Sequence, residues 1–259
     1  MSMLLQGRKA IVTGGNTGIG KACAERLARE GASVCVNYYS AKEADGAGEL
    51  AAQLRQGGAP MAIAVQGDVG READVVRLVG QAAQELGGLD LLVNNAGIEK
   101  QIPLLQMGLE DWNAVLTTNL TGAFLCLREA GKVMVGAGGG VIVNISSVHE
   151  FIPWPGFAHY CASKGAIKLL MQTAARELAE QKIRVVNIAP GAIITPINQF
   201  VLDDPEQEHA VVSEIPLGRM GQAEEVAAAV AWVASEQAAY VTGTTIVVDG
   251  GMSLYPKFV

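Results

Sequence analysis

The sequence predicts an α/β fold: a doubly wound sheet of about seven parallel strands with helices on both faces, in a single domain spanning residues 1–259. Short apolar runs rich in β-branched residues alternate with longer stretches of helical spacing, which is the pattern of strand–helix–strand units. The runs are apolar almost throughout, as expected for strands covered on both faces. No Pro/Ser-rich linker and no internal repeat divides the chain, so one domain is the simplest expectation.

Seven apolar runs are the expected strands. In chain order they cover 10–13, 33–38, 62–66, 89–94, 141–146, 184–188 and 244–248. The stretches between them have helical spacing, for example apolar residues at positions 75, 76, 78 and 79. The segment VGAGGG at 135–140 is expected to end a helix and turn into a strand. The proline-containing connection 190–216 is long for a compact domain, and we expect it to form a substrate lid.

Composition and charge argue against several classes of function. The chain is 50% hydrophobic and 17% charged, which suits a large core. Its net charge of -7 argues against nucleic-acid binding and against attraction to anionic lipid. No apolar run reaches the ~18–20 residues that span a bilayer, and the first residues lack a secretory signal. We therefore expect a cytoplasmic protein with no membrane partner. Its cysteines and histidines lack metal-ligand spacing, so we expect no metal.

A glycine-rich turn follows the first expected strand and opens an amphipathic helix. Its glycines, Gly14, Gly18 and Gly20, have the spacing Gly-x3-Gly-x-Gly. Glycines allow a pyrophosphate to approach the backbone, and the helix N-terminus offers free N–H groups and a partial positive charge. A glycine triplet alone also suits an ordinary turn. Its position between strand and helix favours a dinucleotide site.

Three residues form a candidate catalytic set. Tyr160 and Lys164 are four apart and therefore share one helix face. Ser147 closes the preceding strand, at the sheet edge where such folds bind ligands. Oxidation of an alcohol needs a base for the hydroxyl proton, and an ordinary tyrosine, with a pKa of about 10, is a poor one. A nearby ammonium group is expected to lower the pKa of Tyr160, while Ser147 polarises the substrate oxygen.

These motifs together resemble the short-chain dehydrogenase/reductase family over residues 7–251. The resemblance rests on TGxxxGIG at 13–20, NNAG at 94–97, and the serine, tyrosine and lysine just described. It implies a Rossmann-type fold, NADP or NAD as cofactor, and a nicotinamide ribose bound by Lys164. It also implies a fourth catalytic residue, Asn119, which would hold a proton-relaying water. A mid-helix asparagine is otherwise a locally bonded or solvated residue.

The resemblance and the local sequence give a set of candidate cofactor residues. They are Gly14, Asn16, Thr17, Gly18, Ile19, Gly20, Tyr39, Ser40, Asp68, Val69, Asn95, Ala96, Gly97, Tyr160, Lys164, Pro190, Gly191 and Thr195. No acid follows the second strand before Glu43, and an acid there would repel a 2′-phosphate. Ser40 and Lys42 instead favour NADP, or use of both cofactors. Lys42 also suits the start of a solvated helix, and Asp68 a helix N-cap.

Segments on the substrate side resemble one branch of that family, the bacterial glucose 1-dehydrogenases. They are SSVHE at 146–150, IPWP at 152–155, TPIN at 195–198 and DGGMSLYP at 249–256. This implies oxidation of β-D-glucose at C1 to glucono-lactone. Candidate sugar ligands are Glu99, Ser147, His149, Trp154 and Asn198. Glu99 also suits a solvated position, His149 a loop-orienting one and Trp154 the core.

Other classes of function would require different side chains. A 3-oxoacyl-thioester reductase would show a basic patch at the cleft, and Arg184 and Arg219 make no convincing one. Another aldose or alcohol dehydrogenase of the family is a further possibility. A non-catalytic cofactor-binding regulator would be expected to lack a member of the catalytic set.

Apolar helices at 117–135 and 160–178, with the tail 252–259, predict a homotetramer.

Overall fold

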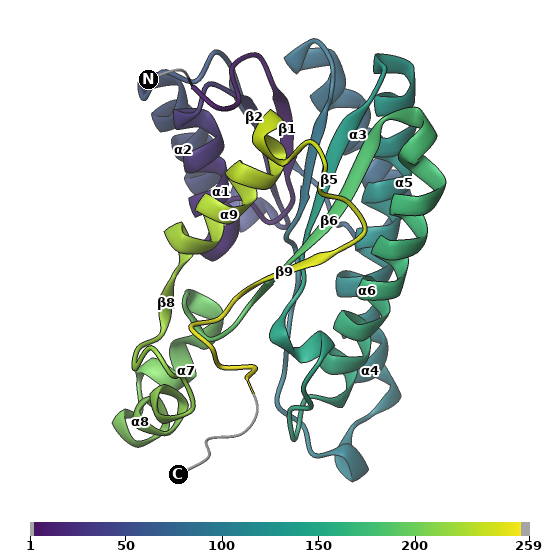
Figure 1. The fold of residues 1–259 in the computed structure, drawn as a ribbon. Coiled ribbons are helices and arrows are strands. Elements are labelled where there is room, and N and C mark those ends of the chain that lie inside the picture. The colour runs from purple at the N-terminus through teal and green to yellow at the C-terminus, as the bar shows by residue number, and fades with distance from the viewer. Residues whose placement is uncertain (1–2, 255–259) are drawn as a thin grey trace.

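Seven parallel strands form the central sheet of the computed structural model, which describes residues 3–254 (Figure 1). Their order is β3-β2-β1-β4-β5-β6-β9, the order of a doubly wound sheet. All seven predicted runs form strands. The strands are β1 (Lys9–Val12), β2 (Ser33–Tyr38), β3 (Ala62–Gln66), β4 (Leu91–Asn94), β5 (Gly140–Ile145), β6 (Ile183–Pro190) and β9 (Thr245–Val248).

Helices cover both faces of the sheet and enclose two separate cores. The helices α1 (Gly18–Arg29), α2 (Ala44–Gln56) and α9 (Ala223–Ala234) pack on one face. The helices α3 (Glu72–Leu86), α5 (Gly122–Ala137) and α6 (Ala158–Leu178) pack on the other, and α4 (Leu109–Leu116) lies against α6. Because side chains alternate along a strand, Ala10 and Val12 enter the first core and Ile11 enters the second. This explains why the strands are apolar throughout.

The connection 190–216 is more regular than the sequence suggests. After β6 the chain forms β7 (Ile193–Ile194), α7 (Gln199–Leu202) and α8 (Pro205–Ser213), and β7 pairs with β8 (Gly221–Gln222). Two of its prolines begin short helices, since Pro196 starts the 3-10 turn Pro196–Asn198 and Pro205 is the first residue of α8. At the lower left of Figure 1, α7 and α8 lie beyond the carboxyl edge of the sheet, opposite α4.

Neither a membrane-spanning helix nor a metal-binding cluster occurs in the described residues. Within residues 3–254, no helix is both long and apolar enough to cross a membrane. Over the same residues, no three His, Cys, Asp or Glu side chains gather in a group that could hold a metal ion. The cysteines are free thiols, of which Cys23, Cys35 and Cys126 are buried.

The turn between β1 and α1 has the backbone conformation that only glycine adopts easily. Gly14 and Gly18 have φ angles of 57° and 51°. At Gly20 the constraint is space, because a Cβ there would lie 2.1 Å from the carbonyl oxygen of Gly14 and 2.5 Å from Nδ2 of Asn95. That amide donates to the carbonyl oxygens of Thr13 at 2.9 Å and Gly14 at 3.0 Å. The glycine-rich turn and the segment after β4 are therefore one packed unit.

We expect the substitution Gly20→Ala to destabilise this unit by ~1–3 kcal/mol and to weaken dinucleotide binding, because backbone atoms would have to move. Gly80→Ala is the matched control. It lies in α3, where an added Cβ meets nothing within 4 Å, and should stabilise by roughly 0.5–1 kcal/mol. Urea unfolding and cofactor titration measure both effects. Wild-type stability and cofactor affinity in Gly20→Ala would contradict the packing described.

Candidate active site

A cavity of about 600 Å³ opens at the carboxyl edge of the sheet and contains most of the predicted site residues. It lies where the strand order reverses between β1 and β4, the usual ligand position in such folds. Predicted residues that line it are Gly14, Thr17, Gly18, Ile19, Asn95, Ala96, Gly97, Glu99, Ser147, His149, Trp154, Tyr160, Lys164, Pro190, Gly191, Thr195 and Asn198. Others lie outside its lining: Asn16, Gly20, Tyr39, Ser40, Asp68, Val69 and Asn119.

The catalytic set converges in this cavity. Tyr160 and Lys164 lie one turn apart on α6, and the Nζ atom of Lys164 is 5.4 Å from the centre of the Tyr160 ring. Lys164 is only 5% exposed, and its Nζ donates to the carbonyl oxygen of Ile145, at the end of β5, at 2.9 Å. Ser147 follows that strand end, and its hydroxyl accepts from the backbone N–H of His149 at 3.2 Å. Helix face and strand end thus meet around one buried ammonium group.

Burial dominates the acid–base behaviour of the site. It raises the pKa of Tyr160 well above its ordinary value, Glu99 raises it further, and a hydrogen bond from Ser147 lowers it. Burial lowers the pKa of Lys164 to about 8, while Glu99 and Glu150 raise it. Burial raises the pKa of Glu99 to about 7, against the effect of Lys164. The sequence led us to expect a lowered pKa for Tyr160, whereas in the protein itself loss of hydration raises this pKa.

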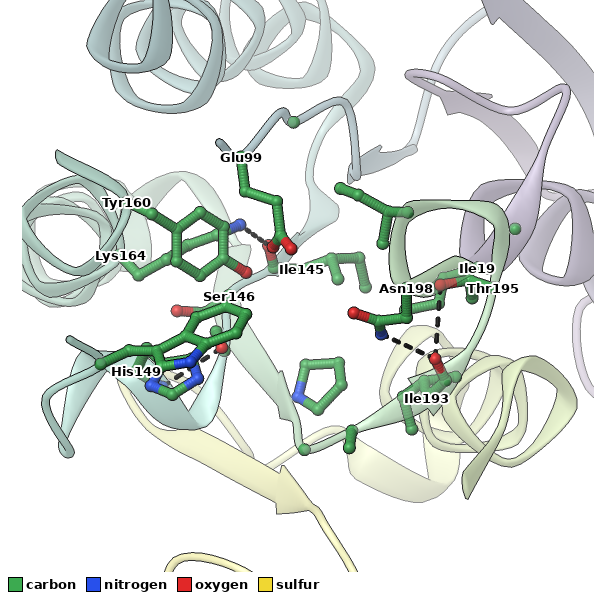
Figure 2. Close-up of a pocket in the computed structure, with 18 of the residues that line it drawn as sticks. Ile19, Glu99, Ile145, Ser146, His149, Tyr160, Lys164, Ile193, Thr195 and Asn198 are labelled. Carbon is green, nitrogen blue, oxygen red and sulfur yellow. Dashed lines mark hydrogen bonds between the residues drawn. The ribbon is translucent and has the colours of Figure 1, made fainter. Parts of the chain in front are cut away.

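Glu99 and Asn198 lie on opposite sides of the cavity. Figure 2 shows the Glu99 carboxyl group facing Tyr160 and Lys164. Within the described residues, its Oε1 atom is buried and has no hydrogen-bond partner. The side-chain amide of Asn198 donates to the carbonyl oxygen of Ile193 at 2.8 Å, which leaves its oxygen on the cavity side (Figure 2). A carboxyl group and an amide oxygen therefore border the cavity on opposite sides.

Aromatic rings form one wall of the cavity. Trp154 stacks on His149 with ring centres 4.6 Å apart and on Phe157 with ring centres 3.6 Å apart. Tyr160 stands edge-on to the Trp154 ring at 6.2 Å. The Nδ1 atom of His149 lies 3.2 Å from the carbonyl oxygen of Ile152, so this ring also orients its own loop. Trp154 is already engaged by two rings and serves as a wall rather than as a free stacking surface.

Asn119 lies in a π-helical turn, Thr117–Thr121, that joins α4 to α5. Such turns are frequent at functional sites. Its Nδ2 donates to the carbonyl oxygen of Ile98 at 3.0 Å and to the hydroxyl of Ser163 at 3.2 Å. Its Oδ1 accepts from the backbone N–H of Ile98 at 2.8 Å. Asn119 is buried and ties the segment that carries Glu99 to the helix that carries Tyr160 and Lys164.

At the adenosine end, sequence reasoning missed Glu43. Its Oε2 accepts from Nδ2 of Asn16 at 3.3 Å and from the backbone N–H of Tyr39 at 3.0 Å. Ser40 and Glu43 form a reciprocal capping box, whose Ser-x-x-Glu pattern was readable in the sequence. The carboxylate lies between the glycine-rich turn and the end of β2, where an acid binds ribose hydroxyls. Lys42 is exposed beside it. Charges of both signs therefore lie beside the end of β2.

Asp68 and Val69 have structural contacts of their own. The Asp68 carboxylate accepts from the backbone N–H of Gly70 at 2.9 Å. It therefore caps this turn rather than α3, whose N-cap is Arg71. Val69 is buried against Gly122, where an added Cβ would lie 2.8 Å from its Cγ2. Their role as cofactor residues remains a prediction.

Comparison with known proteins identifies the family. A family model described as "Enoyl-(Acyl carrier protein) reductase" matches residues 14–253. The chain is 48% identical to 3beta-hydroxysteroid dehydrogenase 1 of Eggerthella lenta, over 98% of this chain and 97% of that protein. It is 44% identical to glucose 1-dehydrogenase of Gluconobacter oxydans, over 97% and 94% of the two chains.

A solved structure also matches. Gluconate 5-dehydrogenase from Burkholderia cenocepacia, in complex with NADP and tartrate, superposes with a TM-score of 0.93 at 33% identity, covering 98% of each chain. Fold, motifs and relatives agree over almost the entire chain. The protein belongs to the short-chain dehydrogenase/reductase family, whose members are oxidoreductases that use NAD or NADP.

Proposed function

We propose that this oxidoreductase acts on a sugar, and specifically that it oxidises β-D-glucose at C1 to glucono-lactone with reduction of NADP or NAD. The observation that carries the proposal is the Glu99 oxygen, buried in the cavity without a partner. An unpaired buried acceptor costs ~1–3 kcal/mol, which a ligand hydroxyl that donates to it recovers. A polyol supplies such hydroxyls next to the reacting carbon, and Asn198 offers a second acceptor across the cavity.

The residues around the cavity suit the proposed chemistry. The substrate oxygen would lie between the hydroxyls of Ser147 and Tyr160, so that Tyr160 takes the hydroxyl proton. The Lys164 ammonium stabilises the phenolate as it forms. Asn119 would support this proton transfer by fixing α6 through Ser163. Because burial raises the pKa of Tyr160 in the protein itself, we expect its proton to leave within the ligand-bound site.

The cofactor would lie between the glycine-rich turn and the segment after β4, because both segments line the cavity. The close approach at Gly20 leaves no room for a side chain between them. Pro190, Gly191 and Thr195 border the substrate end of the cavity and would hold the nicotinamide. When bound, the oxidised nicotinamide accepts the hydride and brings a positive charge.

A hydroxysteroid is a second substrate class with a specific observation in its favour. Much of the cavity is apolar, including Ile152, Pro153, Ile197 and Val201, and such a surface suits a steroid skeleton. A hydrocarbon skeleton, however, offers no donor to the buried Glu99 oxygen, which is why we favour the sugar.

Thioester reduction and a regulatory role without turnover have less support from the site. A thioester reductase would need free basic groups at the cleft. Arg184 instead donates to the carbonyl oxygens of Val233 and Val241, and Arg219 forms a bidentate pair with Glu225. A regulator without turnover would not be expected to retain a complete catalytic set in one cavity.

We further propose that α7 and α8 form the substrate lid. Val201 of α7 and Val211 of α8 both line the cavity. These helices follow directly on the segment that would hold the nicotinamide, so cofactor and substrate contacts would order the same stretch of chain.

We expect Tyr160→Phe to reduce turnover by ~10²–10⁴-fold while cofactor affinity stays near the wild-type value, because only the phenol oxygen moves the proton. Initial rates, followed by absorbance of the reduced cofactor, and a separate cofactor titration measure the two quantities. A variant that kept more than about a tenth of the wild-type rate would exclude Tyr160 as the proton-transfer residue.

A substrate panel with Glu99→Gln tests the sugar proposal. We expect the wild type to turn over glucose with NADP or NAD. The substitution should lower kcat/KM for glucose by roughly 10- to 150-fold, the effect of losing a hydrogen bond to a charged group. A simple secondary alcohol should be affected less, and Glu110→Gln, at an exposed position of α4, should change neither. Turnover of 3-hydroxysteroids in preference to every aldose would refute the proposal.

We also propose that the protein is a homotetramer. The helices α5 and α6 and the edge strand β9 expose apolar side chains that a neighbouring subunit would cover, namely Phe124 (41%), Val135 (48%), Leu169 (66%) and Val247 (41%). Of the expected tail contacts, Tyr255 and Phe258 lie outside the described residues. Light scattering should give four times the chain mass. A fully active monomer would end this proposal.

A further inference from the structure

A row of buried polar side chains crosses the sheet directly below the active site. Asn94, Asn144, Asn187 and Thr245 are register partners on the neighbouring strands β4, β5, β6 and β9. The three asparagines are almost completely buried. Each lies one to three residues before a segment that lines the cavity, so the row connects the strand ends that carry the site.

The hydrogen bonds along this row run in one direction. Asn94 donates through Nδ2 to Oδ1 of Asn144 at 3.0 Å, and Asn144 donates likewise to Asn187 at 2.9 Å. Asn187 then donates to Oε2 of Glu150 at 3.2 Å. The direction is fixed at the start, because Asn94 also donates to the carbonyl oxygen of Ala123 at 3.1 Å, and a carbonyl can only accept. It is fixed at the end by an acceptor-only carboxylate.

Glu150 collects two further hydrogen bonds. The hydroxyl of Ser146 donates to its Oε2 at 2.5 Å, and the hydroxyl of Thr245 donates to its Oε1 at 2.6 Å. Glu150 also closes the turn that begins at Ser147, because its backbone N–H donates to the Ser147 carbonyl oxygen at 3.0 Å. One side chain therefore joins the end of β5 to β6, to β9 and to the catalytic serine turn.

We propose that Glu150 is a positioning residue of the active site, which fixes the turn carrying Ser147 against β6 and β9 and supplies a negative charge to the buried Lys164 ammonium. Ser147 and Lys164 both depend on the end of β5, the first through the chain and the second through the Ile145 carbonyl oxygen. An amide at position 150 would present an NH₂ group to donors that now converge on a carboxylate. The inference rests on the proposed roles of Ser147 and Lys164.

The negative charge of Glu150 and its hydrogen bonds should affect activity differently, because only the charge changes the pKa of Lys164. The groups that act on Lys164 are Glu99 from the segment after β4, Glu150 from the turn after β5, and Tyr160 on its own helix, with His149 next to Tyr160. Both carboxylates raise the pKa of Lys164. Removing one carboxylate lowers the pKa of Lys164, so the ammonium loses its proton at a lower pH. The alkaline loss of any activity that requires the ammonium should therefore begin at a lower pH than in the wild type.

The experiment compares the pH dependence of kcat in the wild type, Glu150→Gln and Thr245→Val, with any substrate that the wild type turns over. For Glu150→Gln we expect a kcat at least about tenfold lower and an alkaline limb displaced by about one pH unit toward acid. Thr245→Val loses one hydrogen bond but no charge. It should lower the thermal midpoint and leave the alkaline limb in place.

The outcomes separate this inference from the proposed function. An active wild type with an unmoved alkaline limb in Glu150→Gln overturns the role of Glu150 only, whereas a wild type that oxidises no sugar overturns the proposed function. If Glu150→Gln does not fold, Glu150→Asp keeps the charge with a shorter reach. It should keep the wild-type limb with a reduced kcat, and a wild-type kcat in that variant overturns the positioning role.

Discussion

The buried ammonium group of Lys164 is the constraint around which the active site is arranged. Lowering its pKa from an ordinary value near 10.5 to about 8 corresponds to a destabilisation of roughly 3 kcal/mol for the charged form. Within the described residues, its hydrogen bond is to the Ile145 carbonyl oxygen. The remaining compensation comes from Glu99 on the cavity side and from Glu150 in the turn after β5. This destabilised ammonium lies where a phenolate forming on Tyr160 would need a positive charge.

These groups lie close together because the strands of the sheet are parallel. All carboxyl ends reach one edge, so residues far apart in the sequence arrive together without a dedicated scaffold. The amide row joins β4, β5 and β6 just before the segments that line the cavity, and Glu150 joins this row to β9. A slip of one residue in any of these pairings would turn an asparagine to the other face of the sheet. The same row therefore also sets the relative position of the strand ends that border the cavity.

Much of this arrangement could be predicted from the sequence because it depends on local patterns. Continuous apolar runs predicted every strand of the main sheet, and the spacing of Tyr160 and Lys164 placed both on one helix face. Other features depend on partners that are distant in sequence. Glu150 meets Thr245, which is 95 positions away, and no local pattern announces that contact. The raised pKa of Tyr160 results from burial in the assembled cavity. Glu43 is intermediate, since its capping box was visible but its contact with Asn16 was not.

Burial raises the pKa of Tyr160, so we expect this phenol to stay neutral until ligand binds. Near-ultraviolet titration of tyrosine ionisation in the free protein tests this most directly, with Tyr160→Phe subtracted to isolate one phenol among five. We expect the difference spectrum to show no phenolate until the pH is above about 10, the ordinary pKa of tyrosine. A phenolate of Tyr160 that forms in the free protein below pH of about 9 would contradict it.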